Sequence, residues 1–243
     1  MRAHVRQFVQ VAVETLRLEG PCYEFGSYQE GASRAESDLR PLFAGQEYVG
    51  CDLRPGPGVD RLEDLTQLRL PDQVAQTVLC LDTLEHVWDP VRAVAEMIRV
   101  LAPGGVLLLS VPMDFPIHAF PDDYWRLTPS CLARLLRPLG ASLVGSVGWE
   151  KHPHTVLAAG WKAPLAKDLP RRVAQLLAAY RRRLQQHKRS ARGWKHWRRR
   201  LLRPLWPKDR RLRHKHYWDA AFTFHVRQPA SNAFLALQGL VEP

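Results

Sequence analysis

The sequence predicts an α/β fold, with a doubly wound and mostly parallel sheet followed by a basic, mainly helical C-terminal extension. Three observations predict it. Short apolar runs alternate with segments of helical periodicity over residues 1–163. The run at 106–111 is apolar on both faces, as is typical of a central parallel strand covered by helices on each side. Charge also divides the chain: residues 1–160 hold 14 Lys and Arg against 20 Asp and Glu, whereas residues 161–228 hold 21 against 3.

The length of 243 residues, 46% of them apolar, is enough for one sizeable core and an appendage. We therefore predict a domain over residues 1–163 and a basic extension over 164–243. Charged residues interrupt the N-terminal apolar segment, and no run reaches the ~18 apolar residues of a membrane-spanning helix, so we expect a cytoplasmic protein. The four cysteines are widely separated and three fall in expected strands, so they predict neither a metal site nor a disulfide.

The elements of the first half follow from periodicity and from turn residues. A first helix is expected to end at Gly20-Pro21, and its spaced apolar residues are Val5, Phe8, Val9, Ala12, Val13 and Leu16. A strand over 22–26, a helical stretch to about residue 42 and a strand over 47–52 form a βαβ unit, which implies parallel pairing. A third strand is expected before Asp64 and a fourth over 76–81.

The second half continues the alternation. Asp89 as N-cap and Pro90 at the first helical position open a helix that is expected to stop at Pro103-Gly104-Gly105. In the extension, Asp168 and Pro170 open a basic amphipathic helix. The remaining expected elements are a helix over 129–139 and strands over 106–111, 142–147, 155–161 and 220–226.

Acidic residues follow the expected strands, and ligands bind outside the carboxyl ends of the strands in an open parallel sheet. Glu24 suits a cationic group, and the glycine at 26 lets the backbone approach a ligand closely. Asp52 can accept hydrogen bonds from both hydroxyls of a ribose. Asp64 or Asp82 can accept from the exocyclic amine of an adenine, with the side chain at Leu65 packing on the ring. Each acid alone can equally be a helix cap or a solvated loop charge.

Four blocks stand in order along the chain: Glu24 and Gly26 as E-x-G, YVGCD at 48–52, DTLEHVWDP at 82–90, and RVLAPGGVLLLSVP at 99–112. Together they resemble the small-molecule class I S-adenosylmethionine (SAM) dependent methyltransferases, of the type 11 kind, over roughly residues 20–140. The resemblance implies a Rossmann-like fold and SAM as the cofactor. It implies the methionine end of SAM at Glu24 and Gly26, the ribose at Asp52, and the adenine beside Asp64, Leu65 and Asp82.

The glycine-rich loop departs from the family's E-x-G-x-G-x-G pattern. Tyr28 and Glu30 stand where the second and third glycines belong, and a side chain there is expected to obstruct close backbone approach. Either the loop takes another path, with Gly31 in use, or cofactor binding is weak or lost. The missing G-x-G-x-x-G also argues against a nicotinamide enzyme.

Methyl transfer depends mainly on alignment, because the sulfonium already activates the methyl group, but an oxygen or nitrogen acceptor also needs a base. His118 is the first candidate because histidine titrates near neutral pH. The other candidates are Asp114, Asp123, Tyr124 and His86. A surface or hydrogen-bonding role is the alternative for His118.

We therefore expect a methyltransferase that acts on an oxygen or nitrogen of a small molecule, a cell-surface glycan or a lipid-linked precursor. The segment FPIHAFPDDYWRLTP at 115–129 favours the glycan, because it is similar to a bacterial branch associated with cell-surface glycan synthesis. The alternatives are an RNA-directed methyltransferase and an inactive methyltransferase-like scaffold. Residues 164–228 interleave Trp with cations, which favours peripheral contact with an anionic membrane, with nucleic acid as second choice and a solvated helical cap as the plainer alternative.

Overall fold

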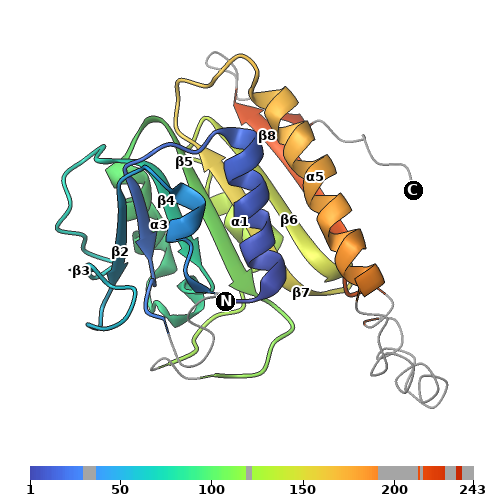
Figure 1. Cartoon of the computed structure of the whole chain (residues 1–243), viewed down its shortest axis with the longest axis horizontal. Coiled ribbons are helices and arrows are strands. Elements are labelled where there is room, and N and C mark those ends of the chain that lie inside the picture. The colour runs from blue at the N-terminus through green and yellow to red at the C-terminus, as the bar shows by residue number, and fades with distance from the viewer. Residues whose placement is uncertain (30–36, 119–121, 191–212, 214–215, 228–233, 237–243) are drawn as a thin grey trace.

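The computed structural model describes residues 1–29, 37–118, 122–190, 213, 216–227 and 234–236 (Figure 1). Its strands are β1 (Cys22–Phe25), β2 (Tyr48–Asp52), β3 (Arg61–Leu62), β4 (Ala75–Leu81), β5 (Leu101–Pro112), β6 (Ala141–Trp149), β7 (His152–Trp161), β8 (Ala220–Arg227) and β9 (Phe234–Ala236). The α-helices described at full length are α1 (Ala3–Leu16), α3 (Pro90–Val100), α4 (Pro129–Leu135) and α5 (Leu169–Ser190). Two short 3-10 helices are η2 (Arg40–Phe43) and η3 (Leu84–His86).

In the described residues the strands form one sheet of nine, in the order β3-β2-β1-β4-β5-β7-β6-β8-β9. Strands β1 to β5 pair in parallel, and every pairing from β5–β7 onward is antiparallel. Helices cover both faces: α1 and α5 lie on one side, and α3 and α4 lie on the other (Figure 1). The predicted doubly wound α/β fold is confirmed.

Alternating residues of the central strands supply the two halves of the core. Leu79 and Leu108 face the layer that contains α1 and α5, whereas Val78 and Leu107 face the layer that contains α3 and α4. All four side chains are fully buried. This arrangement explains why β4 is apolar over 78–81 and β5 over 106–109, since neither face of these segments contacts water.

Several element boundaries differ from those expected: α1 ends at Leu16 instead of next to Gly20-Pro21, and β7 starts at His152 instead of at residue 155. Two further differences have a local cause in the sequence. Helix α4 ends at Leu135 instead of at residue 139, because Pro138 lacks an N–H and restricts the residue before it. Strand β5 starts at Leu101, before the three residues Pro103-Gly104-Gly105 that were expected to separate helix from strand. The register of β4 and β5 shifts between the Ala75 and Thr77 pairs, so the Pro-Gly-Gly segment is an irregularity inside the strand.

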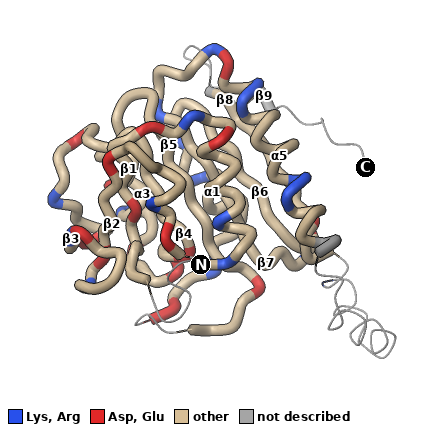
Figure 2. Tube along the Cα trace, in the orientation of Figure 1, with Lys and Arg blue, Asp and Glu red and all other residues tan. Residues whose placement is uncertain are grey.

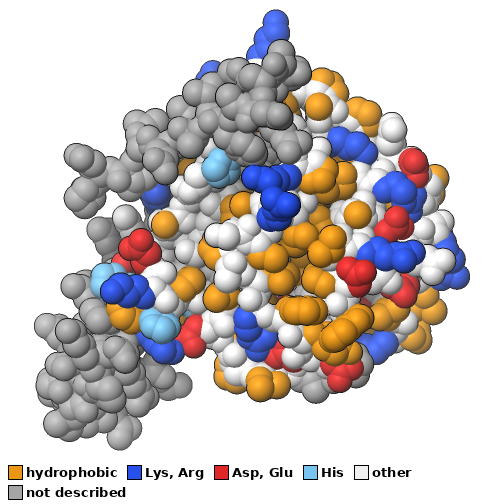
Figure 3. Space-filling model, turned by 180° about the vertical axis from the view of Figure 1, so that it is seen from behind, with side chains coloured by type: hydrophobic (Ala, Val, Ile, Leu, Met, Phe, Trp, Pro, Cys, Tyr) orange, Lys and Arg blue, Asp and Glu red, His pale blue; other side chains and the backbone are white. Residues whose placement is uncertain are grey.

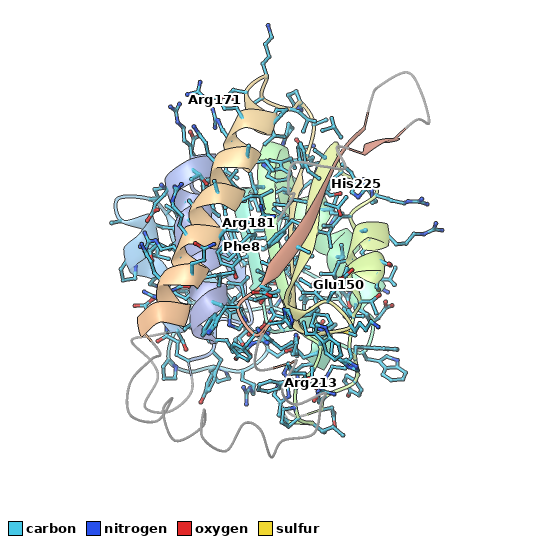
Figure 4. All side chains as sticks on the ribbon, turned by 90° about the vertical axis from the view of Figure 1, so that its right-hand side faces the viewer. Phe8, Glu150, Arg171, Arg181, Arg213 and His225 are labelled. Carbon is cyan, nitrogen blue, oxygen red and sulfur yellow. The ribbon has the colours of Figure 1, made fainter. Side chains whose placement is uncertain are left out.

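The apolar stripe of α5 is buried against α1. Val173, Leu176, Tyr180 and Leu184 are at most 2% exposed. The Tyr180 hydroxyl donates to the His4 carbonyl oxygen at 3.1 Å, and Phe8 lies beside α5 in the side view of Figure 4. Because this packing occupies the apolar stripe, the solvent-facing side of α5 carries arginines, among them Arg171 and Arg181 (Figure 4).

The C-terminal extension contributes to the same sheet, because β8 pairs with β6 from Ala141↔Val226 to Val147↔Ala220. This confirms the strand expected at 220–226. The Trp-rich stretch at 194–206 lies outside the described residues, as does the loop position Glu30–Gly31. Among the described helices, none combines the length and apolar character needed to cross a membrane. The division at residues 163 and 164 stays a prediction.

Candidate functional site

The carboxyl ends of β1, β2, β4 and β5 meet at the edge of the sheet where the N-terminus lies (Figure 1). The strand order reverses between β1 and β4, and in open α/β sheets the crevice at such a reversal is the usual ligand site. Figure 2 shows acidic positions at this edge, beside the N-terminus. Three predicted site acids, Glu24, Asp52 and Asp82, lie in or directly after these strands.

Asp52 holds the loops after β1 and β2 together. Its carboxylate accepts hydrogen bonds from the backbone N–H of Tyr28 at 3.2 Å and of Arg54 at 3.1 Å. The side chain is 14% exposed, so it is accessible at the strand end. Each carboxylate oxygen has a second lone pair, and Asp52 can therefore accept further hydrogen bonds from a ligand.

Tyr28, which stands in place of a family glycine, packs against the loop after β2. The Arg54 guanidinium lies over its ring, 4.5 Å from the centroid. A Cβ added to Gly56 would come within 2.3 Å of a ring carbon, so only glycine leaves room for the tyrosine there. Gly58 has a φ of +87°. A Cβ added to it would lie 2.4 Å from the Ser27 carbonyl oxygen in the loop after β1. The β2–β3 loop thus accommodates the altered sequence.

Gly26 has a φ of +80°, and a Cβ added to it would lie 2.1 Å from the Thr83 hydroxyl oxygen. Glycine is therefore required at this position by the approach of the loop after β4. The backbone N–H groups of Gly26 and Ser27 both donate to the Cys51 carbonyl, which sets the loop against the end of β2.

Glu24 is buried in the sheet. It is 5% exposed, and its Oε2 accepts a hydrogen bond from the Tyr48 hydroxyl at 2.5 Å. Burial raises the pKa of Glu24 to about 7, although the Tyr48 hydrogen bond opposes that rise. A group of this kind is neutral in mildly acidic solution and becomes charged near neutrality.

The raised pKa of Glu24 makes folding stability depend on pH. The pKa of Glu24 is higher in the folded than in the unfolded chain, so its protonated form favours the folded state. This contribution is full at pH values below the unfolded pKa of about 4.5 and is lost as the pH rises through about 7. Titration of Glu24 should lower the free energy of unfolding of the wild type between pH 5 and pH 8. In Glu24→Gln this decrease should be smaller by about 2 kcal/mol. Urea unfolding of both proteins at the two pH values measures this. Parallel pH profiles would show that Glu24 does not titrate in this range.

Asp82 directly follows β4 and pairs with Arg2 from the start of the chain. Arg2 donates through Nη2 to Oδ1 at 2.7 Å and through Nε to Oδ2 at 3.2 Å, and the Ser110 hydroxyl donates to Oδ1 at 2.7 Å. Burial acts to raise the pKa of Asp82, but Arg2 and Ser110 outweigh it and hold the pKa below its ordinary value. The expectation that Asp82 faces adenine stays a prediction, and its carboxylate already has strong partners.

Arg2 joins Asp82 to a second buried network. Its Nη1 donates to the Thr155 hydroxyl at 2.6 Å and to the His154 carbonyl at 2.9 Å. His4 contacts the same hydroxyl at 2.7 Å, and burial lowers its pKa to about 3, so the ring is neutral. The sequence pattern gives no sign of Arg2, because its partners are about 80 and 150 residues away.

Asp64 and Leu65 have local roles in the described residues. The Oδ1 atom of Asp64 accepts from the backbone N–H and the hydroxyl of Thr66, at 2.8 and 2.7 Å, which forms an exposed turn. Leu65 is 7% exposed and belongs to the core beside α3. Their place beside an adenine stays a prediction.

His118 lies beside a group that the loops after β4 and β5 bring together. Its Nδ1 is 3.1 Å from Asp123 Oδ2, and its ring is 4.7 Å from that of His86, edge to face. Asp123 also accepts from Arg126 at 2.5 and 2.7 Å, and this ion pair holds its pKa below the ordinary value. Thus His118, His86 and Asp123 of the predicted candidates are neighbours.

Glu85 completes this group and was missed by the sequence analysis. It is fully buried in η3, next to His86, and burial raises its pKa to about 8. Neither carboxylate oxygen has a hydrogen-bond partner among the described residues. An acid beside a histidine after a buried strand was the available signal, but the sequence does not show that this acid points inward.

The other candidates lie further out. Asp114 pairs with Arg213 at 2.6 Å, at the lower end of the view in Figure 4. Tyr124 donates from its hydroxyl to Asp122 at 2.7 Å, and its ring lies 5.2 Å from that of Trp88. These contacts leave Tyr124 on the rim of the site, 42% exposed.

Comparison with known proteins relates the chain to methyltransferases. A family model described as a methyltransferase domain matches residues 37–109. A probable SAM-dependent methyltransferase of Mycolicibacterium smegmatis is 35% identical over 109 residues, which are 42% of this chain and 39% of that protein. A similar protein of Mycobacterium tuberculosis is 37% identical over 65 residues, 24% of each chain. The chain thus spans about two fifths of the length of the Mycolicibacterium relative and about a quarter of that of the Mycobacterium relative.

Solved structures of similar fold include methyltransferases. One is the 1,6-didemethyltoxoflavin N1-methyltransferase of Burkholderia thailandensis with bound S-adenosylhomocysteine, at 19% identity and a TM-score of 0.49, covering 66% of this chain and 79% of that one. Another is a SAM-dependent methyltransferase of Mesorhizobium loti, at 15% identity and a TM-score of 0.47, covering 65% and 98%. The sequence matches at 37–109 and the observed α/β sheet show that this part of the chain is similar to SAM-dependent methyltransferases.

Proposed function

We propose that this protein transfers a methyl group from SAM to an oxygen or nitrogen atom of a small molecule, a cell-surface glycan or a lipid-linked precursor. The observation that carries the proposal is the convergence at one sheet edge of a ligand-accessible carboxylate, Asp52, with the histidine group at His118 and His86. An acceptor for cofactor hydroxyls and a proton acceptor for the substrate are the two functions that such a transfer needs from the chain.

The residues after β1 and β2 fit the cofactor. The buried Ser27 hydroxyl has no hydrogen-bond partner among the described residues, and an unpaired buried donor favours a ligand atom beside it. The Tyr28 N–H that bonds to Asp52 follows directly in the same loop. Asp52 would hold the ribose hydroxyls, and Ser27 would contact the neighbouring part of SAM.

The chemistry divides simply between cofactor and chain. SAM, when bound, supplies an already activated methyl group, so the chain has to align the acceptor and remove its proton. His118 would take that proton at Nε2, because its Nδ1 lies 3.3 Å from the Pro116 carbonyl oxygen, which can only accept, and its backbone N–H donates to Asp123 at 3.0 Å. Asp123 is in turn held by Arg126, which makes it a positioning residue.

Exposed apolar side chains surround this group and support an acceptor with an apolar or ring-shaped part. Trp88 is 70% exposed, Ile117 89% and Phe115 42%, and the Phe115 ring lies 5.1 Å from that of His118. Figure 3 shows further hydrophobic side chains gathered beside charged ones on the face opposite α1 and α5. Exposed aromatic side chains next to a polar centre are typical of small-molecule sites.

Calorimetry of the full chain with SAM and with S-adenosylhomocysteine tests the proposal. We expect both to bind at one site per chain. Absence of binding at millimolar ligand would instead support the inactive scaffold. If both bind, His118→Gln should keep the affinity for S-adenosylhomocysteine and lower the rate of methyl transfer by about a hundredfold once an acceptor is found.

The basic extension is proposed to contact an anionic partner, with a membrane favoured over nucleic acid. Because α1 covers the apolar stripe of α5, this contact would depend on arginines such as Arg171 and Arg182 instead of on inserted apolar residues. Pull-down onto anionic vesicles and onto RNA at low and high salt distinguishes the two partners, and binding to neither would leave α5 as a solvated cap.

A further inference from the structure

We propose that Glu85, His86 and His118 bind a divalent transition-metal ion of the Zn²⁺ class at the carboxyl end of β4. One ligand atom from each residue, a carboxylate oxygen or a ring nitrogen, lies within 4.8 Å of the others. The three residues come from η3 and from the loop after β5, so the fold of the sheet brings them together.

Glu85 is the first reason for this proposal. Its side chain is fully buried, and both oxygens lack a hydrogen-bond partner among the described residues. A buried carboxyl group without a partner is unfavourable, and more so when it is charged. The His86 ring lies beside it, with Nε2 3.8 Å from Glu85 Oε1. A cation between the two would satisfy the carboxylate.

The outer hydrogen bonds of the two histidines are the second reason. His86 Nδ1 lies 2.5 Å from the Asp122 carbonyl oxygen, and His118 Nδ1 lies 3.3 Å from the Pro116 carbonyl oxygen. Histidines that bind metals usually donate the proton of one ring nitrogen to a carbonyl or carboxylate, which leaves the other nitrogen as the ligand atom. The same pattern here assigns Nε2 of both rings as the ligand atoms.

The donor set decides the class of ion. Two imidazoles and one carboxylate suit Zn²⁺ and related transition metals, whereas Mg²⁺ and Ca²⁺ prefer oxygen ligands throughout. On a tetrahedral Zn²⁺ the ligand atoms lie about 3.4 Å apart for bonds of about 2.1 Å. Because the ligand atoms now lie within 4.8 Å of one another, binding of the ion would draw them closer together.

Three protein ligands leave a fourth position for water or for an acceptor oxygen. Tyr124, which lies beside Trp88 on the rim where the acceptor is proposed to bind, donates its backbone N–H to the Glu85 carbonyl at 2.8 Å. If the proposed methyl transfer is correct, the ion would bind the acceptor oxygen and lower its pKa. In the metal-bound protein His118 Nε2 would be a ligand and the acceptor proton would pass to solvent, so the base role proposed for His118 applies to the metal-free protein. Metal binding itself does not depend on that role.

Titration of the chelator-treated full chain with Zn²⁺ in a calorimeter, and with Co²⁺ followed by visible absorption, tests the site. We expect one ion per chain, and Co²⁺ bands typical of a four- or five-coordinate nitrogen and oxygen site. Glu85→Gln and His118→Gln should each weaken Zn²⁺ binding by more than about tenfold. His152→Gln, which changes an exposed histidine elsewhere, is the matched control and should bind as the wild type does.

Glu85→Gln is expected to fold, because it replaces a buried acid by a neutral group of the same shape. Urea unfolding and S-adenosylhomocysteine binding of the same variants check this. The metal site is overturned if the wild type does not bind Zn²⁺, or if both variants bind the cofactor and keep the Zn²⁺ affinity of the wild type. Neither outcome contradicts the proposed methyl transfer. Zn²⁺ binding that depends on Glu85, without cofactor binding, would keep the metal site and reject the transferase.

Discussion

Asp52→Ala is expected to weaken the binding of S-adenosylhomocysteine by more than about tenfold. The Asp52 carboxylate is the accessible acceptor at the end of β2, and charged hydrogen bonds to ligand hydroxyls are stronger than neutral ones. Calorimetry of the two proteins measures the change. Unchanged affinity would reject the ribose assignment.

Two controls separate a lost ligand contact from a disturbed loop. Asp52→Asn keeps an oxygen for one of the backbone N–H groups of Tyr28 and Arg54, so it should keep the loop while it loses the charge. Asp168→Ala removes an exposed carboxylate that pairs with Arg172 of α5, outside the proposed cofactor site, and should leave the affinity unchanged. An S-adenosylhomocysteine analogue without ribose hydroxyls should bind wild type and Asp52→Ala alike, because the contact under test is absent from both complexes.

The parts of the fold that depend on local pattern could be predicted from the sequence. Helix α3 begins where Asp89 was expected to cap it, and the Asp89 side chain accepts from the Arg92 N–H. Strands β4 and β5 were recognised because they are apolar on both faces. Short-range rules explain these elements: a cap needs one side chain, and a buried strand needs one apolar run.

The surroundings of the strand-end acids could not be predicted in the same way. The position of Asp52 at a strand end was correct, but its hydrogen bonds to the loop depend on the path from Gly26 to Gln29. Leu65 was expected on a ligand ring, although its position three residues beyond β3 is equally compatible with the core that it joins. Burial of Glu85 depends on the packing of η3, for which the sequence has no periodic signal.

Arg2→Ala is expected to lower the free energy of unfolding at pH 7 by about 3 kcal/mol. The substitution leaves the largely buried Asp82 carboxylate with Ser110 as its remaining side-chain partner, and it removes the donors to Thr155 and to the His154 carbonyl. Breaking one side of a buried ion pair is unfavourable chiefly because the other charge stays buried. Urea unfolding at pH 7 measures the loss.

Arg183→Ala is the matched control, because Arg183 pairs with Glu14 at 3.1 Å on the exposed surface between α1 and α5. Exposed pairs contribute about 0–1 kcal/mol, so this variant should stay close to the wild type. The double variant Arg2→Ala with Asp82→Asn should recover part of the loss, since a neutral amide is easier to bury than a carboxylate. Equal losses in Arg2→Ala and Arg183→Ala would contradict the argument.

The loss in Arg2→Ala should also depend on pH in a direction fixed by Asp82. Because Arg2 and Ser110 outweigh the effect of burial, the folded pKa of Asp82 lies below the unfolded value of about 3.8. The ionised Asp82 therefore contributes stability above that value, and this contribution is lost as the pH falls through the folded pKa. The difference between wild type and Arg2→Ala should be full at pH 7 and narrow below about pH 4. A difference that stays constant into acid would assign the effect of Arg2 to its contacts with Thr155 and the His154 carbonyl, which do not titrate.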